Sequence, residues 1–91
     1  MNPFFSIIIP VYNVEDFILS VLNSISIQTF TDFELIIYDD LSTDNSVNFV
    51  KNWLSTNKLK SKFIISKKNN GASYGLNECI KNSKGSYIVF G

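Results

Sequence analysis

Runs of apolar residues alternate along the chain with polar and turn-forming segments. Four of the apolar runs are short and nearly continuous. The three longer segments between them contain apolar residues every three or four positions, and this spacing predicts helices. The short runs are rich in β-branched and aromatic residues, and we expect each to form a strand. They cover residues 4–9, 33–38, 63–65 and 87–90. The predicted order is β-α-β-α-β-α-β, and strands separated by helices imply a parallel sheet with crossover connections.

The first predicted helix runs from about residue 14 to residue 27. Pro10 is expected to end the strand before it, because proline cannot donate to a sheet ladder. Asn13 would be the helix N-cap, with Asp16 three residues later in a position like that of a capping box. An apolar stripe at helical spacing is its expected buried face, formed by Phe17, Ile18, Val21, Leu22 and Ile25.

The second and third helices are predicted in the same way. The second begins near residues 42–44, where Asp44 would lie at the positive end of the helix dipole. Its apolar residues are Val47, Phe49, Val50, Trp53 and Leu54. For Phe49 and Trp53 the alternatives are the core and a subunit contact. The third helix would be capped by Ser73 and stopped near Gly85. Its expected inner face consists of Leu76, Cys79 and Ile80.

The second strand ends in two carboxylates, Asp39 and Asp40. A near-continuous hydrophobic run such as 33–38 is typical of a parallel strand buried on both faces. Ligands of open α/β sheets bind beyond the carboxyl ends of such strands. We therefore expect a ligand site here. The alternatives are a solvated loop carboxylate for Asp40, and for Asp39 a role in orienting the following turn or capping the next helix.

Composition narrows the classes of function. The 91 residues are 45% hydrophobic, and eight lysines balance eight acidic residues, without arginine or histidine. A neutral chain has no electrostatic footprint for nucleic acid. The single Cys79 cannot form an intramolecular disulfide, which favours a cytoplasmic location. The apolar runs are shorter than the roughly 20 residues that span a bilayer, and no basic segment precedes the first run, so we expect no signal peptide. Peripheral membrane association stays open.

An ordered set of short motifs covers nearly the whole chain. It comprises Ser6–Asn13, Gln28-Thr29 before 33–37, Asp39-Asp40 with 42–44, Asn70–Ser73 followed by Asn77, and Gly85–Phe90. Each motif is weak alone, but together they resemble the N-terminal half of the family 2 glycosyltransferases, which are inverting enzymes with a GT-A fold. The resemblance implies a Rossmann-like unit over residues 1–91 that binds a nucleotide-diphosphate sugar, in an enzyme of polysaccharide or glycan synthesis.

The resemblance also implies which residues contact the nucleotide. The Pro10, Tyr12 and Asn13 loop would lie beside the base, and Asp40 would accept a hydrogen bond from a base imide N–H, which is a strong charge-assisted bond. An imide occurs in uracil and thymine, and guanine also offers an N–H, so UDP is favoured without excluding dTDP or GDP. The remaining members of the implied set are Asp39, Gly71 and Asn77. For Gly71 and Asn77 the alternatives are turn geometry and an ordinary helix surface.

The chain departs from the family pattern at two places. Leu76 stands where the family usually has a basic residue. The Asp-x-Asp motif that would hold Mg or Mn and the later carboxylate that acts as general base are expected beyond Phe90, and neither is present in these 91 residues. We therefore expect no catalytic residue here and no glycosyl transfer by this chain alone.

Two other classes of function remain to be compared. A dinucleotide-binding unit is disfavoured, because the first strand-to-helix turn lacks Gly-x-Gly-x-x-Gly. A non-catalytic, self-associating module is the second alternative. If the strand order is 3-2-1-4, the last strand lies at an edge of the sheet, where it could pair with another chain as a homo-oligomer.

Overall fold

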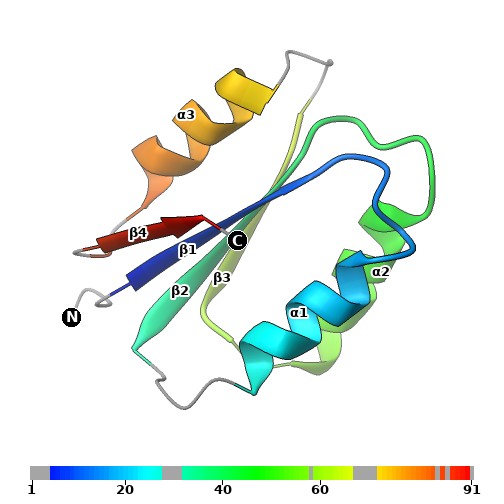
Figure 1. Ribbon diagram of the computed structural model, residues 1–91, viewed down its shortest axis with the longest axis horizontal. Helices are drawn as coiled ribbons and strands as arrows, with labels where there is room; N and C mark the ends of the chain where they lie inside the picture. The colour runs from blue at the N-terminus through cyan, green and yellow to red at the C-terminus, as the bar shows by residue number, and fades with distance from the viewer. Residues whose placement is uncertain are drawn as a thin grey trace.

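The computed structural model of the protein describes residues 5–27, 32–57, 59–66, 72–83, 85 and 87–90. Within them the chain forms one four-stranded sheet and three helices in the predicted alternating order (Figure 1). The elements are β1 (Phe5–Val11), α1 (Ile18–Ser26), β2 (Phe33–Asp39), α2 (Ser46–Thr56), β3 (Ser61–Ile65), α3 (Ala72–Asn82) and β4 (Tyr87–Phe90).

The sheet has the order β3-β2-β1-β4 and all of its neighbouring strands are parallel. The α/β class and the parallel pairing confirm the predictions, and the order is the one that the sequence analysis considered as a condition for β4 lying at an edge. All seven residues of β2 are buried, because β2 has a neighbour on each side and helices on both faces. That position explains why its sequence is almost continuously apolar.

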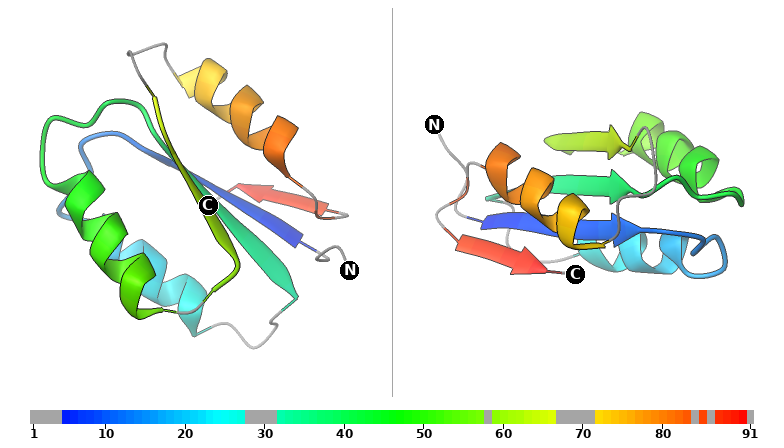
Figure 2. Two further views of the ribbon diagram at one scale, coloured as in Figure 1. Left: turned by 180° about the vertical axis from the view of Figure 1, so that it is seen from behind. Right: turned by 90° about the horizontal axis from the view of Figure 1, so that it is seen from above.

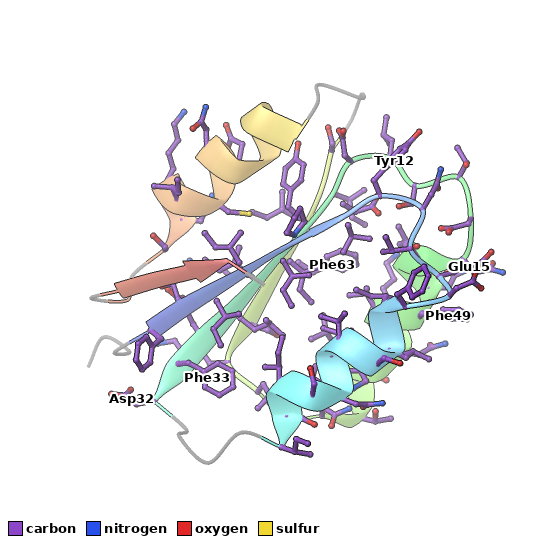
Figure 3. All side chains as sticks on the ribbon, in the orientation of Figure 1. Tyr12, Glu15, Asp32, Phe33, Phe49 and Phe63 are labelled. Atoms are coloured by element: carbon purple, nitrogen blue, oxygen red, sulfur yellow. The ribbon has the colours of Figure 1, made fainter. Side chains whose placement is uncertain are left out.

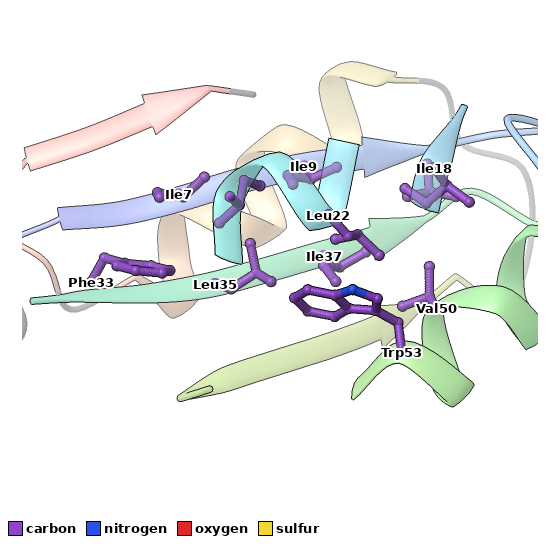
Figure 4. Close-up of a cluster of buried hydrophobic side chains, with 11 residues drawn as sticks. Ile7, Ile9, Ile18, Leu22, Phe33, Leu35, Ile37, Val50 and Trp53 are labelled. Carbon is purple, nitrogen blue, oxygen red and sulfur yellow. The ribbon is translucent and has the colours of Figure 1, made fainter. Parts of the chain in front are cut away.

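Helices cover both faces of the sheet (Figure 2), and each face has its own cluster of buried apolar side chains. On one face, α1 and α2 pack against alternate residues of β1 and β2, with Leu22 and Trp53 at the centre (Figure 4). On the other face, α3 places Cys79 against Ile8, Ile36 and Tyr38. The burial of Trp53 and Cys79 is as predicted.

β1 extends one residue past Pro10, so the prediction that proline ends this strand was wrong. The carbonyl oxygen of Val11 accepts a hydrogen bond from the Asp40 N–H on the β2 side at 3.0 Å. Successive residues of a strand point their backbone groups to opposite sides, so Pro10 faces the β4 side. Among the described residues, the pairing of β1 with β4 ends at Ile8, so the missing N–H of Pro10 costs no β1–β4 ladder bond in this part of the sheet.

α1 begins at Ile18, four residues later than predicted, and Asn13 is not its N-cap. The residue at the N-cap position is Phe17, which makes no side-chain capping bond and is 68% exposed rather than buried. Asp16 is correspondingly not part of a capping box. Asn13 has φ 51°, which is a left-handed conformation that asparagine tolerates better than most residues.

The other two helices also differ from prediction at their starts. α2 begins at Ser46, so Asp44 precedes the helix instead of lying in its first turn. α3 begins at Ala72, which places Ser73 inside the helix and not at its cap. Ile80 is 43% exposed and does not belong to the inner face. Gly85 is not a helix cap but packs against β1, where an added Cβ would lie 2.5 Å from the Ser6 backbone nitrogen.

Candidate functional site

The loops that follow β1 and β2 meet at one edge of the sheet. The register pairs Val11 with Asp39, and the Asp40 N–H donates to the Val11 carbonyl at 3.0 Å. Tyr12 and Asp40 are therefore the next residues on two adjacent parallel strands. Tyr12 is 47% exposed and Asp40 is half-buried, so an aromatic ring and a carboxylate border the same solvent-facing edge.

The opposite end of β2 provides a useful contrast. Asp32, an exposed carboxylate, immediately precedes β2. Figure 3 shows Asp32 and Tyr12 at opposite ends of the sheet. The site edge is thus the carboxyl end of the strands, as expected for ligands of open α/β sheets.

Asn13 ties the first loop to the second through its own amide group. Its Oδ1 accepts hydrogen bonds from the backbone N–H of Thr43 at 2.7 Å and of Asp44 at 3.3 Å. Its backbone N–H donates to Ser42 Oγ at 2.9 Å. The amide oxygen of Asn13, in the loop that the resemblance places beside the base, therefore accepts hydrogen bonds from the neighbouring loop.

Asp39 is completely buried and anchors the second loop. Its Oδ2 accepts from the Ser42 N–H at 3.0 Å, and its Oδ1 accepts from Ser42 Oγ at 2.5 Å. Asp39 thus orients the turn that follows it, which is the structural alternative considered for it from the sequence.

Further hydrogen bonds between the same loops involve residues that the sequence analysis did not assign to the site. Ser46 Oγ accepts from the Val14 N–H at 2.9 Å. Asp44 Oδ2 accepts from the Glu15 N–H at 3.1 Å, and Glu15 Oε2 accepts from the Asn45 N–H at 3.3 Å. The signal for this role was the density of hydroxyl and carboxylate side chains directly after β2, which we had interpreted as helix capping.

The pKa of Asp44 reflects this bonding. Desolvation raises the pKa of this carboxyl, but hydrogen bonds from Ser46 and from the backbone N–H of Glu15 outweigh it, so the pKa lies below its ordinary value of 3.8. The carboxylate is therefore ionised, and able only to accept, at neutral pH.

The remaining predicted site residues lie in β1, in α3 or outside the described residues. Pro10 is exposed in β1, two residues before Tyr12. Asn77 is exposed on α3, which covers the other face of the sheet. α3 approaches the end of β2 at Gly75, where an added Cβ would lie 2.5 Å from the Tyr38 ring. Gly71 lies outside the described residues.

The described part of the chain contains no group of three or more His, Cys, Asp or Glu side chains that could hold a metal ion. The residues described here thus do not fit a divalent metal by themselves, and we derive no chemical step through one. In the same residues, no helix is both long and apolar enough to cross a membrane.

Comparisons with known proteins point to one family. The model of "Glycosyl transferase family 2" matches residues 6–90. The chain is 36% identical over 89 residues to the poly(ribitol-phosphate) beta-N-acetylglucosaminyltransferase TarS of Staphylococcus aureus (strain Mu50), covering 94% of this chain and 15% of that protein. It is 42% identical over 88 residues to the UDP-Glc:alpha-D-GlcNAc-diphosphoundecaprenol beta-1,3-glucosyltransferase WfaP of Escherichia coli, covering 93% and 33%. The chain therefore spans between about one-seventh and one-third of these relatives.

Solved structures agree with the sequence comparison. The crystal structure of S. aureus TarS in complex with UDP-GlcNAc has a TM-score of 0.86 at 35% identity and covers 99% of this chain and 26% of that one. A mannosyltransferase from Pyrobaculum calidifontis, in complex with GDP-Man and Mn2+, has a TM-score of 0.89 at 24% identity, covering 97% and 26%. The second likeness concerns the fold alone.

Proposed function

Because this chain belongs to glycosyl transferase family 2, we propose that it forms the donor-binding part of an inverting enzyme that transfers a sugar from a nucleotide diphosphate to an acceptor hydroxyl. Residues 1–91 are assigned to nucleotide binding. Transfer is assigned to a complete enzyme, in which further residues supply a divalent metal site and a general base. One free, buried cysteine, Cys79, fits a cytoplasmic location, with attachment to a membrane surface left open.

One observation carries the proposal: Tyr12 and Asp40 follow paired residues of β1 and β2 and border one exposed edge. The Tyr12 ring offers a surface on which a base can stack, a contact worth about 1–3 kcal/mol per base. The Asp40 carboxylate can accept a hydrogen bond from the imide N–H of uracil, and bonds to charged groups contribute about 1.5–3 kcal/mol. UDP is the favoured nucleotide, since relatives of this chain include a UDP-Glc transferase and a structure holding UDP-GlcNAc.

Cytidine nucleotides provide a sharp test of the Asp40 assignment. Cytosine carries an acceptor at N3 in place of the imide N–H, so a carboxylate at this position would repel it. Isothermal titration should therefore show UDP binding and at least about tenfold weaker CDP binding, in line with the value of a charged hydrogen bond. Asp40→Asn should weaken UDP binding by about 10–100-fold and narrow the difference between UDP and CDP.

Matched variants separate the base contacts from general charge and fold effects. Asp32→Asn removes the same charge at the opposite end of β2 and should leave UDP affinity unchanged. Tyr12→Phe keeps the ring and should bind UDP nearly as well as the parent, whereas Tyr12→Ala should lose about tenfold or more. Equal binding of UDP by the parent and Asp40→Asn proteins would refute the assignment, and a folded parent that binds no UDP would refute the function.

The self-associating module stays the second candidate, because β3 and β4 occupy the two edges of the sheet and an edge strand can pair with another chain. Sedimentation of the parent protein over a wide concentration range tests it. A concentration-dependent dimer that binds no UDP would favour this candidate, and a monomer that binds UDP would favour the donor-binding function.

A further inference from the structure

Backbone strain is concentrated one residue beyond each proposed base contact. Among the described residues, the non-glycine positions with positive φ are Asn13, at 51°, and Leu41, at 60°. Asn13 follows Tyr12, and Leu41 follows Asp40. Continuing the β1–β2 register past Val11 and Asp39 places these two strained positions opposite each other. Strained backbone persists only where the surroundings hold it, and it is often found at functional sites.

The two loops that contain these positions are held by reciprocal hydrogen bonds, which we call the loop interlock. Each loop supplies both donors and acceptors, so neither can rotate without breaking bonds to the other. In the first loop the interlock consists of Asn13, Val14 and Glu15. On the other side it runs from the last residue of β2 through the second loop to the first residue of α2, and consists of Asp39, Ser42, Thr43, Asp44, Asn45 and Ser46.

In two members of the interlock, the acceptor oxygens already take part in hydrogen bonds within the protein. A carbonyl oxygen has two lone pairs, and Asn13 Oδ1 already accepts from the Thr43 and Asp44 N–H groups. Asp39 is completely buried, and both of its oxygens accept from Ser42. By contrast, Tyr12 is 47% exposed and Asp40 is half-buried.

We propose that Asn13 and Asp39 are positioning residues of the nucleotide site, which fix the directions of Tyr12 and Asp40 through the loop interlock without touching the nucleotide. This inference rests on the proposed function of donor binding. Asn13 provides the left-handed backbone that turns the chain after Tyr12, and its amide joins that turn to the second loop. Asp39 fixes the turn after Asp40 through Ser42. The ring and the carboxylate are thereby held in place before the nucleotide arrives, which avoids the entropic cost of ordering them on binding.

Asn13→Gly is the most informative variant, because glycine keeps the left-handed backbone and removes the side-chain amide, whose oxygen is the acceptor in the interlock. UDP affinity should fall about tenfold, as expected for the loss of a hydrogen bond of ordinary strength that acts on the bound geometry. Ser55→Ala is the matched control, since it removes an exposed side-chain hydrogen bond on α2, far along the chain from either loop. Its UDP affinity should equal that of the parent.

Amide hydrogen exchange reports the interlock without any ligand. In Asn13→Gly, the Thr43 N–H should lose at least about tenfold in protection, because its acceptor is gone. The amide of Ile36, in the fully buried β2, should keep its protection. Unchanged protection at Thr43 would overturn the interlock itself.

A double-mutant cycle separates positioning from general destabilisation. If Asn13 acts through the direction of Tyr12, then Asn13→Gly should weaken UDP binding about tenfold in the parent and less than about twofold in the Tyr12→Ala background. A purely structural role predicts equal losses in both backgrounds, measured at a temperature where all four proteins are folded. Asp39→Asn should likewise lose its effect in the Asp40→Ala background.

The possible results distinguish this inference from the proposed function. A parent protein that binds UDP while Asn13→Gly binds it equally well would overturn the inference and leave the function standing. The inference would also fall, with the function still standing, if Asn13→Gly weakened UDP binding equally in the parent and in the Tyr12→Ala background. A folded parent that binds no UDP would overturn the function, and the positioning role would fall with it.

Discussion

Replacing Gly85 by alanine tests how closely the segment before β4 packs against β1. A Cβ at this position would lie 2.5 Å from the Ser6 backbone nitrogen, 2.6 Å from the Phe5 carbonyl carbon and 2.6 Å from Ser6 Oγ. Two of these three neighbours are backbone atoms of a strand that is paired on both sides. The new methyl group therefore cannot be accommodated by rotating a side chain.

The size of the effect follows from the displacement required. Ordinary contact begins at 3.4 Å, so a Cβ 2.5 Å from the Ser6 nitrogen needs the two segments to separate by 0.9 Å (3.4 − 2.5). That shift would break the 2.7 Å hydrogen bond from the Gly85 N–H to Ser6 Oγ and stretch the adjoining β1–β4 ladder. Overpacking costs about 1–3 kcal/mol and a lost hydrogen bond about 1 kcal/mol. We expect a loss of about 2–4 kcal/mol from a total unfolding free energy of about 5–15 kcal/mol.

Urea unfolding followed by far-ultraviolet circular dichroism measures this loss. The midpoint should fall with the slope unchanged, and thermal unfolding should occur about 8–30 °C lower, at about 4–8 °C per kcal/mol for a domain of this size. Ser83→Ala is the control, since it lies in the same connection and removes only a side-chain bond to the Ile80 carbonyl. Ser83→Ala should change the unfolding free energy by no more than about 1 kcal/mol.

Removing the Ser6 hydroxyl identifies the atoms responsible. In the Gly85→Ala background, Ser6→Ala relieves the contact with Oγ but leaves both backbone contacts, so stability should not recover. A Gly85→Ala protein within about 0.5 kcal/mol of the parent would show that β1 and the Gly85 segment separate easily, and would refute the reasoning.

Three further changes test other parts of the structure. Leu41→Gly should raise the unfolding free energy by about 0.5–1 kcal/mol in urea, because φ 60° costs leucine about 1–2 kcal/mol and glycine returns only about 0.5–1 kcal/mol as chain entropy. Burial, with a smaller contribution from Glu78, raises the pKa of the Cys79 thiol from 9.0 to about 11. Between pH 9 and 11 the unfolded chain loses the thiol proton while the folded protein keeps it, so the free energy of unfolding of the parent falls as the pH rises through this window. Cys79→Ala lacks the thiol, and its free energy of unfolding should therefore fall less over the same window. Asn23→Ala should cost about 1–2 kcal/mol, because it removes the acceptor 2.8 Å from the buried Trp53 Nε1.

Each of these changes has an opposite outcome that would count against it. A less stable Leu41→Gly protein would mean that the leucine side chain contributes more by packing than its backbone costs. Identical pH profiles of the parent and Cys79→Ala between pH 9 and 11 would contradict the raised pKa. The control for Asn23→Ala is Asn48→Ala, at an exposed position of α2. If both substitutions lowered the unfolding free energy equally, the hydrogen bond between Trp53 and Asn23 would not contribute to stability.

The α/β class and the order of helices and strands could be predicted because they depend on periodicity. The apolar run of β2 is continuous because this strand is buried on both faces. Leu22 and Ile25 are spaced as in a helix because α1 is buried on one face only. The carboxyl-end location of Tyr12 and Asp40 follows from the same pattern, since it requires only that β1 and β2 are parallel neighbours. These features are encoded by residues close together in the sequence.

The helix starts and the roles of Asn13 and Asp44 could not be predicted in that way. Asparagine and aspartate side chains bond to whichever backbone N–H groups are near, and local reasoning offered only the next helix as partner. In the structure, Asn13 Oδ1 accepts from the Thr43 and Asp44 N–H groups and Asp44 Oδ2 accepts from the Glu15 N–H. These bonds connect residues 29–31 positions apart. Phe17 is exposed for the same reason, because the first loop is held in the interlock and the helix begins only after it.

The two helical layers carry natural probes of their own. Trp53, the single tryptophan, is buried between α2 and the first face of the sheet, and Cys79, the single cysteine, is buried under α3 on the second. Indole fluorescence therefore reports the opening of one layer, and the rate of thiol labelling reports the opening of the other, without any introduced dye or mutation. Agreement between the two signals would show that both layers unfold as one cooperative unit, and earlier labelling of the thiol would show that α3 detaches first.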